Sequence, residues 1–386
     1  GSMIDPQAVP LSLYIHLPWC TRKCPYCDFN SHEGFTESLQ QPYIDALLAD
    51  LDSQQAWWRD RTIESIFIGG GTPSLFEGRW LDMLLEGVSN RVTLSRHVEI
   101  TLESNPGSAE SSRFAEYRAA GVNRLSIGVQ SFDDLALQAL GRIHSGNEAR
   151  RALDMVATAG FQRWNIDLMH GLPGQDAQSG AADLTEAVGR SAGHISWYQL
   201  TTERNTCFWS APPALPNECE LESIQQGGES ILADAGLHQY EVSAFSREGE
   251  ESRHNMNYWR FGDYIGLGAG AHGKISLPDG TIIRTQRTRK PADYLAVTTS
   301  SPLSPPQGVA ISPAGKVTEF AMNTLRLTSG VPLSHFTQTT GSTVEQLTAA
   351  AKTAVSRGWL EAPDTGHFVT TPLGYQFLDS VIETFL

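Results

Sequence analysis

The chain has 386 residues, 40% of them hydrophobic, and a formal net charge of −15. At roughly 150 residues per domain this predicts two to three domains or one large α/β barrel. So acidic a chain lacks the basic face that broad nucleic-acid binding needs, and we expect no nucleic-acid partner. No run of about 20 apolar residues occurs, so we expect no membrane-spanning helix and a reducing, cytoplasmic compartment.

The first half of the chain alternates strand-like apolar segments with segments of helical spacing. Strands are predicted at residues 11–17, 65–68, 98–103, 125–130, 164–169 and 195–200, and helices at 42–58, 80–88, 108–120, 133–140, 147–159 and 181–190. Such a βα repeat argues for a parallel sheet. Six units fit an open, partial (β/α)6 barrel better than a closed eight-fold one, with ligands at the carboxyl ends of the strands.

The pattern changes after about Thr201. A helix is expected at 218–235, a strand at 240–245, a helix at 343–357, and a hairpin from 359–361 and 367–370. Helices followed by a hairpin predict a small C-terminal α+β, winged-helix-like domain, and its few basic residues favour a packing or partner role over DNA binding. We therefore divide the chain into a tag remnant and tail (1–10), the barrel (11–203), a barrel extension (204–297), a Pro/Ser-rich linker (298–315) and the C-terminal domain (316–386).

Three of the five cysteines lie in one loop directly after the first predicted strand. Cys20, Cys24 and Cys27 form a CxxxCxxC pattern, whereas Cys207 and Cys219 are distant and have no role that we can assign. An odd number of cysteines argues against a disulfide framework. Zinc usually takes four ligands in two pairs, whereas three thiolates suit three irons of a 4Fe–4S cluster and leave the fourth iron open. A zinc site completed by His16 or His32, or three unrelated thiols, are the alternatives.

The CxxxCxxC loop after the first strand of a partial barrel resembles that of the radical S-adenosylmethionine (SAM) enzymes. Further segments look like the oxygen-independent coproporphyrinogen III oxidase branch: residues 14–20, 68–73, 103–106, 126–131, 142–144 and 167–173. The resemblance implies a reduced cluster that splits SAM into methionine and a 5′-deoxyadenosyl radical. It also implies SAM contacts from Tyr14, Tyr26, Gly70, Gly71, Thr72, Glu103, Gln130, Arg142 and Asp167. Taken singly, each is as readily explained by a tight turn, a structural hydrogen bond or aromatic packing.

Two departures separate the chain from the oxidases. Phe29 stands where the oxidases carry a further cysteine, and only about ten residues precede the first strand. Both features match instead a paralogous group of radical-SAM haem chaperones. In that group an HNxxYW segment is tied to haem, which implies haem contacts for His254, Asn255, Tyr258 and Trp259. From the residues alone, a turn with a capped histidine and core aromatics is the plainer interpretation.

Two further features compete for a haem role. His272, in a glycine-rich segment, is a second candidate iron ligand, although the glycines are also typical of a tight turn. A basic cluster at Arg284, Arg287, Arg289 and Lys290 could meet porphyrin propionates or an anionic membrane surface, with a solvated loop as the default.

The resemblance implies a haem chaperone that carries a 4Fe–4S cluster and SAM and delivers haem to apo haem proteins of the membrane-bound respiratory chain. The alternatives are an oxygen-independent coproporphyrinogen III oxidase, or a radical SAM enzyme acting on another substrate. Enzymatic activity, dimer formation and transient membrane contact stay open.

Overall fold

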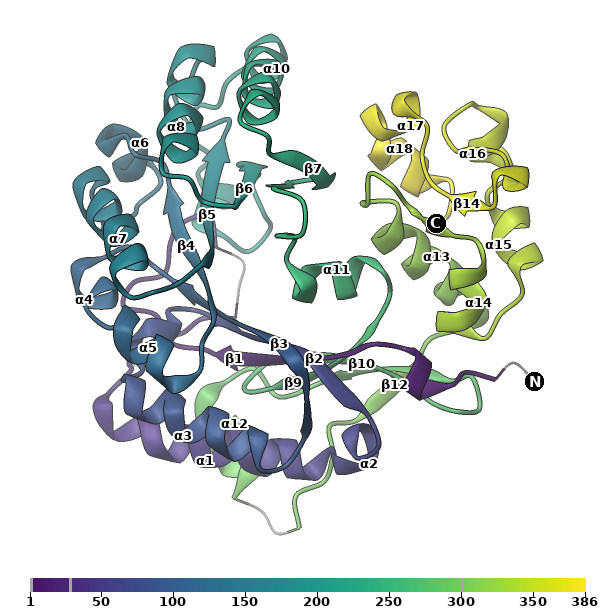
Figure 1. The fold of residues 1–386 in the computed structure, drawn as a ribbon, viewed down its shortest axis with the longest axis horizontal. Helices are drawn as coiled ribbons and strands as arrows, with labels where there is room; N and C mark the ends of the chain where they lie inside the picture. The colour runs from purple at the N-terminus through teal and green to yellow at the C-terminus, as the bar shows by residue number, and fades with distance from the viewer. Residues whose placement is uncertain (1–2, 28–29, 300–301) are drawn as a thin grey trace.

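The computed structural model describes residues 3–27, 30–299 and 302–386, and a single curved sheet lies at its centre (Figure 1). Its strand order is β12-β11-β10-β9-β1-β2-β3-β4-β5-β6-β8-β7. The strands from β9 through β6 in that order run parallel, and the strands at both edges are antiparallel. The predicted parallel βα sheet is thus confirmed, and β9 adds a parallel strand that we did not predict.

The barrel elements follow the predicted order closely. The strands are β1 (Leu11–Leu17), β2 (Thr62–Gly70), β3 (Thr93–Ser104), β4 (Arg124–Gln130), β5 (Arg163–His170) and β6 (His194–Gln199). The helices are α1 (Gln40–Ser53), α2 (Gln55–Trp58), α3 (Gly78–Ser89), α4 (Ser108–Ser111), α5 (Phe114–Ala120), α6 (Asp134–Ala139), α7 (Gly146–Thr158) and α8 (Ala177–Gly189). Two helices that we predicted as continuous, at 42–58 and 108–120, are each divided in two.

The extension completes both edges of the sheet. Its elements are α9 (Cys207–Ser210), α10 (Glu218–Asp234), β7 (His238–Glu241), β8 (Ala244–Ser246), α11 (Arg253–Trp259), β9 (Asp263–Leu267), β10 (His272–Ser276), β11 (Ile282–Gln286) and α12 (Pro291–Thr298). The single strand predicted at 240–245 is wrong, because β7 and β8 form an antiparallel pair there. Within the range predicted as a linker, β12 (Gly308–Ala310) pairs with β11, while residues 300–301 lie outside the described residues.

The two faces of the barrel sheet differ in chemistry because successive side chains of a strand point to opposite faces. On β1, Leu13 and Ile15 are buried under the helices that surround the outer face, whereas Tyr14 and His16 line cavities on the inner face. Other strands repeat this arrangement, with Ile66 and Ile68 outside and Phe67 inside on β2. The outer face therefore supplies the main hydrophobic core, and the inner face is left for polar chemistry.

The C-terminal domain has its own core beside the open side of the barrel (Figure 1). It consists of α13 (Pro313–Thr324), β13 (Val331–Pro332), α14 (Ser334–Thr340), α15 (Val344–Ala350), α16 (Lys352–Ser356), a 3-10 turn at Pro363–Thr365, β14 (His367–Phe368), α17 (Pro372–Gln376) and α18 (Leu378–Glu383). Elsewhere in the chain, short 3-10 turns lie at Pro6–Ala8, Glu37–Leu39 and Pro73–Leu75. The helix predicted at 343–357 is divided. The predicted hairpin is reduced to a bridge between Leu360 and Thr370, since β14 pairs with β13 instead.

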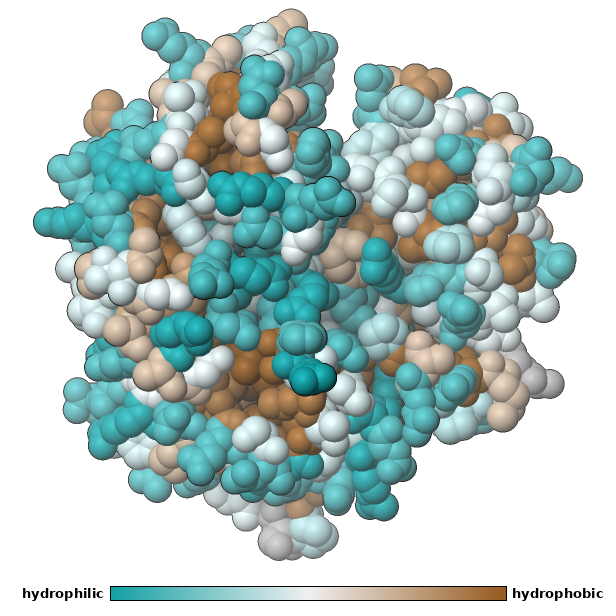
Figure 2. Space-filling view, viewed as in Figure 1, coloured by the Kyte–Doolittle hydropathy of each residue, from teal (hydrophilic) through white to brown (hydrophobic). Residues whose placement is uncertain are grey.

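Buried contacts join this domain to the rest of the chain. Its core includes Ile4 and Val9 from the N-terminal tail and Phe261 and Ile282 from the extension. Figure 2 shows a notch between this domain and the upper barrel helices, on a face where hydrophilic residues predominate. Within the part of the chain that the structure describes, no helix is long and apolar enough to cross a membrane.

Candidate functional site

The three clustered cysteines line a cavity of about 290 Å³ at the carboxyl ends of the strands, which we call the cluster cavity. Cys20 is buried, Cys24 and Cys27 are half-buried, and none forms a disulfide. No three metal-binding side chains among the described residues converge on a single ion. A 4Fe–4S cluster makes no such demand, because each thiolate binds a different iron. The arrangement therefore fits a cluster better than zinc. Phe29 lies outside the described residues.

The glycines after β2 hold the cysteine loop by backbone contact. The N–H of Gly71 donates to the Leu17 oxygen at 2.9 Å, and the N–H of Thr72 donates to the Trp19 oxygen at 2.7 Å. A Cβ at Gly70 would lie 2.3 Å from the Leu17 oxygen, and one at Gly71 would lie 2.4 Å from the Trp19 oxygen. Only glycine permits this approach, so both residues are needed to bring the end of β2 against the chain that leads into Cys20.

Two buried carboxyl groups lie deeper in the cluster cavity. Glu103 accepts from the Gly70 N–H at 3.3 Å, and burial together with the nearby Asp167 raises the Glu103 pKa to about 8. Asp167 accepts from the Asn165 amide at 2.6 Å and from the Ser126 hydroxyl at 3.3 Å, and burial raises its pKa as well. Neither carboxyl forms an ion pair among the described residues, although the charge of the buried Arg124 partly offsets the rise in the Asp167 pKa. Buried carboxyl groups without a counter-ion are typical of a site that receives a cation.

Gln130 and Arg142 complete the wall of this cavity. Gln130 has φ +67°, which is unusual for a residue other than glycine, and its side-chain oxygen accepts from the Tyr198 hydroxyl at 2.8 Å. The Arg142 guanidinium donates to Asn105 at 2.9 Å and lies 3.6 Å from the Cys24 sulfur. Its buried Nε has no hydrogen-bond partner among the described residues. Strained backbone and an unsatisfied donor are features that accumulate at binding sites.

Eight of the nine residues that we predicted to contact SAM line the cluster cavity together: Tyr26, Gly70, Gly71, Thr72, Glu103, Gln130, Arg142 and Asp167. Tyr14 does not line this cavity. Its hydroxyl lies 2.9 Å from His16 Nδ1, and its ring lies between two other cavities. Because period-two alternation places Tyr14 on the inner face, its burial could be foreseen, but not which cavity it enters.

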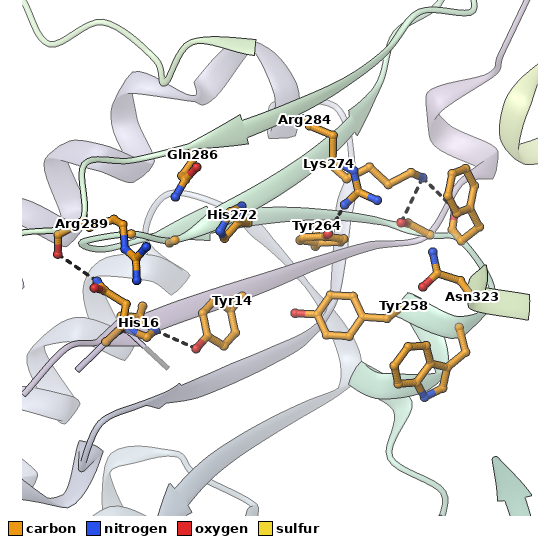
Figure 3. A pocket seen from close by; sticks show the side chains of 16 residues that line it. Tyr14, His16, Tyr258, Tyr264, His272, Lys274, Arg284, Gln286, Arg289 and Asn323 are labelled. Carbon is orange, nitrogen blue, oxygen red and sulfur yellow. Dashed lines mark hydrogen bonds between the residues drawn. The ribbon is translucent and has the colours of Figure 1, made fainter. Parts of the chain in front are cut away.

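A larger cavity of about 510 Å³, which we call the aromatic cavity, lies on the inner face of β1, β9, β10 and β11 (Figure 3). Its apolar walls come from elements far apart in the sequence, and its aromatic lining is Tyr14, Tyr258, Trp259, Phe261 and Tyr264. Sequence reasoning singled out Tyr14, Tyr258, Trp259, His272, Arg284 and Arg289, and named His16 only as a possible zinc ligand; it missed Tyr264, Gln286 and Asn323. The missed residues come from strands and a helix whose pairing was not foreseen.

The HNMNYW segment forms most of helix α11, and the Ser252 side chain caps the N-terminus of this helix. The side chains of the segment line more than one cavity. His254 and Asn255 line a small inner cavity of about 210 Å³, which we call the deep cavity. Tyr258 lines both the deep and the aromatic cavity, and Trp259 lines the aromatic one. The four predicted haem residues therefore surround two cavities rather than one.

His254 is 1% exposed, and both of its ring nitrogens are within hydrogen-bond distance of a hydroxyl group. Its Nδ1 lies 2.8 Å from the Ser65 hydroxyl, its Nε2 lies 2.8 Å from the Tyr258 hydroxyl, and its ring stacks on Phe67. Burial lowers the His254 pKa to about 3, so the ring is neutral at physiological pH. Iron ligation by His254 would require the loss of one of these hydrogen bonds.

The basic cluster predicted at 284–290 is not a continuous charged surface. Arg284 pairs with Glu319, and Arg287 is buried in an ion pair with Asp50 at 2.9 Å. Arg289 and Lys290 are exposed. The cluster therefore contributes two exposed cations, of which Arg289 lines the aromatic cavity.

Comparison with known proteins finds relatives that match nearly the whole chain. The Radical SAM superfamily pattern matches residues 14–184, and the HemN C-terminal domain pattern matches residues 311–377. The protein named heme chaperone HemW from Escherichia coli is 46% identical over 378 residues, which cover 98% of each chain. The chain belongs to the HemW family. A HemW family protein from Haemophilus influenzae is 42% identical over 99% of both chains.

Two less similar proteins also match the chain, one by its sequence and one by its structure. The mitochondrial radical S-adenosyl methionine domain-containing protein 1 of Mus musculus is 40% identical over 72% of this HemW family chain and 63% of its own. The structure of coproporphyrinogen III oxidase HemN from Escherichia coli superposes with a TM-score of 0.81 at 20% identity, over 99% of this chain and 91% of that one. The predicted radical SAM barrel with a small C-terminal domain is thereby confirmed. Superfamily membership implies a 4Fe–4S cluster and SAM.

Proposed function

We propose that this protein is a haem chaperone that carries a 4Fe–4S cluster and SAM and delivers haem to membrane-bound respiratory haem proteins. The observation that carries this proposal is the aromatic cavity, which is separate from the cluster cavity and large enough for a sizeable planar ligand. A radical enzyme that acts only on a substrate next to SAM has no evident need for this second site. The name of the Escherichia coli relative supports the same function.

The cluster cavity supports the cofactor part of the proposal. Cys20, Cys24 and Cys27 would each bind one iron, and the cluster supplies one-electron chemistry to SAM when reduced. Glu103 and Asp167 offer carboxylates to the cationic groups of SAM, while Arg142 can pair with an anionic group. Burial of these groups excludes water and strengthens each charge interaction.

Haem binding and transfer test this function. The full chain with its cluster reconstituted anaerobically should bind haem with a distinct Soret band and pass it to a membrane-embedded apo haem protein. The same preparation with coproporphyrinogen III, SAM and a reductant should form no protoporphyrinogen. Formation of that product would support the oxidase instead, and lack of haem binding would exclude the chaperone.

A further inference from the structure

The histidines around the aromatic cavity differ in whether their ring nitrogens are in use. His16 has Nδ1 2.9 Å from the Tyr14 hydroxyl and Nε2 2.6 Å from the Asn30 oxygen. His254 is occupied at both nitrogens by Ser65 and Tyr258. The imidazole of His272 lines the cavity, is exposed, and has no hydrogen-bond partner among the described residues. An iron ligand needs an available nitrogen, which only His272 offers here.

The hydroxyl groups of the cavity tyrosines are all within hydrogen-bond distance of another side chain. The Tyr14 hydroxyl lies against His16, the Tyr258 hydroxyl lies 2.8 Å from His254, and the Tyr264 hydroxyl accepts from Arg284 at 2.6 Å. Burial raises the pKa of each of these phenols. They are therefore neutral, apolar walls for a flat ligand and not phenolate ligands.

The charge of the aromatic cavity is opposite to that of the chain. Although the chain carries a net charge of −15, the described residues that line this cavity include Lys274, Arg284 and Arg289 and no aspartate or glutamate. Lys274 is bound to Asp263 and to two backbone oxygens, and Arg284 is bound to Glu319. Arg289 is exposed and forms no ion pair among the described residues. It is therefore the cation available for an anionic group on a ligand.

The turn before β10 places His272 at the cavity wall. Gly268 has φ +111°, and a Cβ there would lie 2.4 Å from the His16 oxygen; a Cβ at Gly266 would lie 2.2 Å from the His272 oxygen. These glycines let the turn pack against β1 and start β10 at His272, opposite Gln286 of β11. The glycines thus form the tight turn that the sequence suggested, and the turn itself presents the histidine.

We propose that the aromatic cavity (Figure 3) holds an iron porphyrin dicarboxylate with His272 as its iron ligand and Arg289 on a propionate, while His254 acts as a positioning residue for Tyr258. This inference rests on the proposed function.

Haem titration of the full chain tests the ligand. Loss of a supporting group around a metal typically costs about 10- to 100-fold in affinity, so His272→Ala should weaken haem binding by at least about tenfold and remove the histidine-ligated spectrum. Added imidazole should restore that spectrum. Metal-free protoporphyrin IX should bind this variant as it binds the unchanged protein. His97→Ala, which removes an exposed histidine of β3, is the matched control.

Two further variants make the outcomes distinct. Arg289→Ala should weaken haem and protoporphyrin alike but leave haem dimethyl ester unaffected, because the ester has no carboxylate. His254→Ala, checked for folding by circular dichroism, should keep the ligated spectrum. This inference would be overturned if His272→Ala kept the haem spectrum and affinity of the unchanged protein. It would also be overturned if only the folded His254→Ala variant lost the histidine-ligated spectrum. In both cases haem binding by the unchanged protein would still uphold the proposed function. If the unchanged protein binds no haem, the proposed function itself fails.

Discussion

The cluster cavity and the aromatic cavity lie on the same inner face of one sheet but differ in their acidic residues, while cations line both cavities. The first carries the buried carboxyl groups Glu103 and Asp167, at the carboxyl ends of parallel strands. The second carries aromatic rings and cations, with no aspartate or glutamate among the described residues that line it. The buried carboxyl groups of the first suit the sulfonium and ammonium groups of SAM, and the cations of the second suit the carboxylates of a porphyrin.

The deep cavity lies between these two sites. It shares Glu103 and Asp167 with the cluster cavity and Tyr14 and Tyr258 with the aromatic cavity. Helix α11 supplies its His254 wall, so the HNMNYW segment lies between the cluster cavity and the aromatic cavity. The two sites are therefore structurally adjacent but chemically separable, and each can be disrupted alone.

The largest expected effect is loss of the cluster. Cys24→Ala removes one of three thiolate ligands and should abolish the 4Fe–4S absorption and EPR signals after reconstitution. Haem affinity should not change, because Cys24 does not line the aromatic cavity. Cys207→Ala, an exposed thiol outside both cavities, is the control and should retain the cluster. Loss of haem binding in Cys24→Ala would show that the two sites are not separable.

The next effect concerns the buried ions beneath the aromatic cavity. Asp263 is fully buried between Arg61 at 2.9 Å and Lys274 at 3.2 Å. Asp263→Ala leaves two buried cations unpaired, and breaking a buried pair typically costs about 3–5 kcal/mol. Chemical denaturation should show this loss in the free energy of unfolding. Asp52→Ala, which breaks the exposed pair with Arg91, should change it by at most about 1 kcal/mol. Equal losses in both variants would contradict this account.

How far these sites could be predicted depended on sequence distance. The range of β1 was predicted to the residue, and Glu103, Gln130 and Asp167 were placed at strand ends, because parallel strands bring their carboxyl ends to one edge. Strand β9 was missed because its glycine-aromatic sequence gives no alternation, and its partner β1 lies some 250 residues earlier. The aromatic cavity depends on that pairing, so single residues of it could be named but not assembled.

Charge pairing across the chain was equally hidden. Arg287 looked like part of a basic surface, but it is buried against Asp50 of α1. A short stretch of sequence shows how many cations it contains but not which residues they pair with. Here the pairing residues come from helices more than 30 residues away in the chain. The role of His254 was obscured for the same reason, since Ser65 and Phe67 of β2 hold its ring.

A smaller effect follows from the raised Glu103 pKa of about 8. Below this pH, Glu103 must release its proton before it can pair with a cationic ligand. SAM affinity should therefore rise by up to about tenfold per pH unit below pH 8 and level off above it. Glu103→Gln should flatten this dependence in calorimetric titrations from pH 6 to 9. The exposed Glu64→Gln should retain it.

The same shift has a consequence for stability. Because the folded-state pKa of Glu103 lies above its ordinary value of 4.5, the unfolded chain loses this proton first as the pH rises. The ligand-free protein should therefore lose stability between about pH 4.5 and pH 8, and Glu103→Gln should reduce that loss. A variant with the same pH dependence as the unchanged protein in both experiments would exclude Glu103 as the titrating group.

The smallest effect concerns one hydrogen bond in the cluster cavity. The Tyr198 hydroxyl holds the side-chain oxygen of Gln130, whose backbone has a positive φ. Tyr198→Phe should cost about 1 kcal/mol in the free energy of unfolding and also weaken SAM binding, because the Gln130 amide is no longer oriented. Tyr375→Phe loses a comparable bond, to the Arg326 oxygen in the C-terminal domain, and should lose similar stability with unchanged SAM affinity. Equal SAM affinity in both variants would mean that the cluster cavity does not use the orientation of Gln130, and the strained backbone there would then need a purely structural explanation.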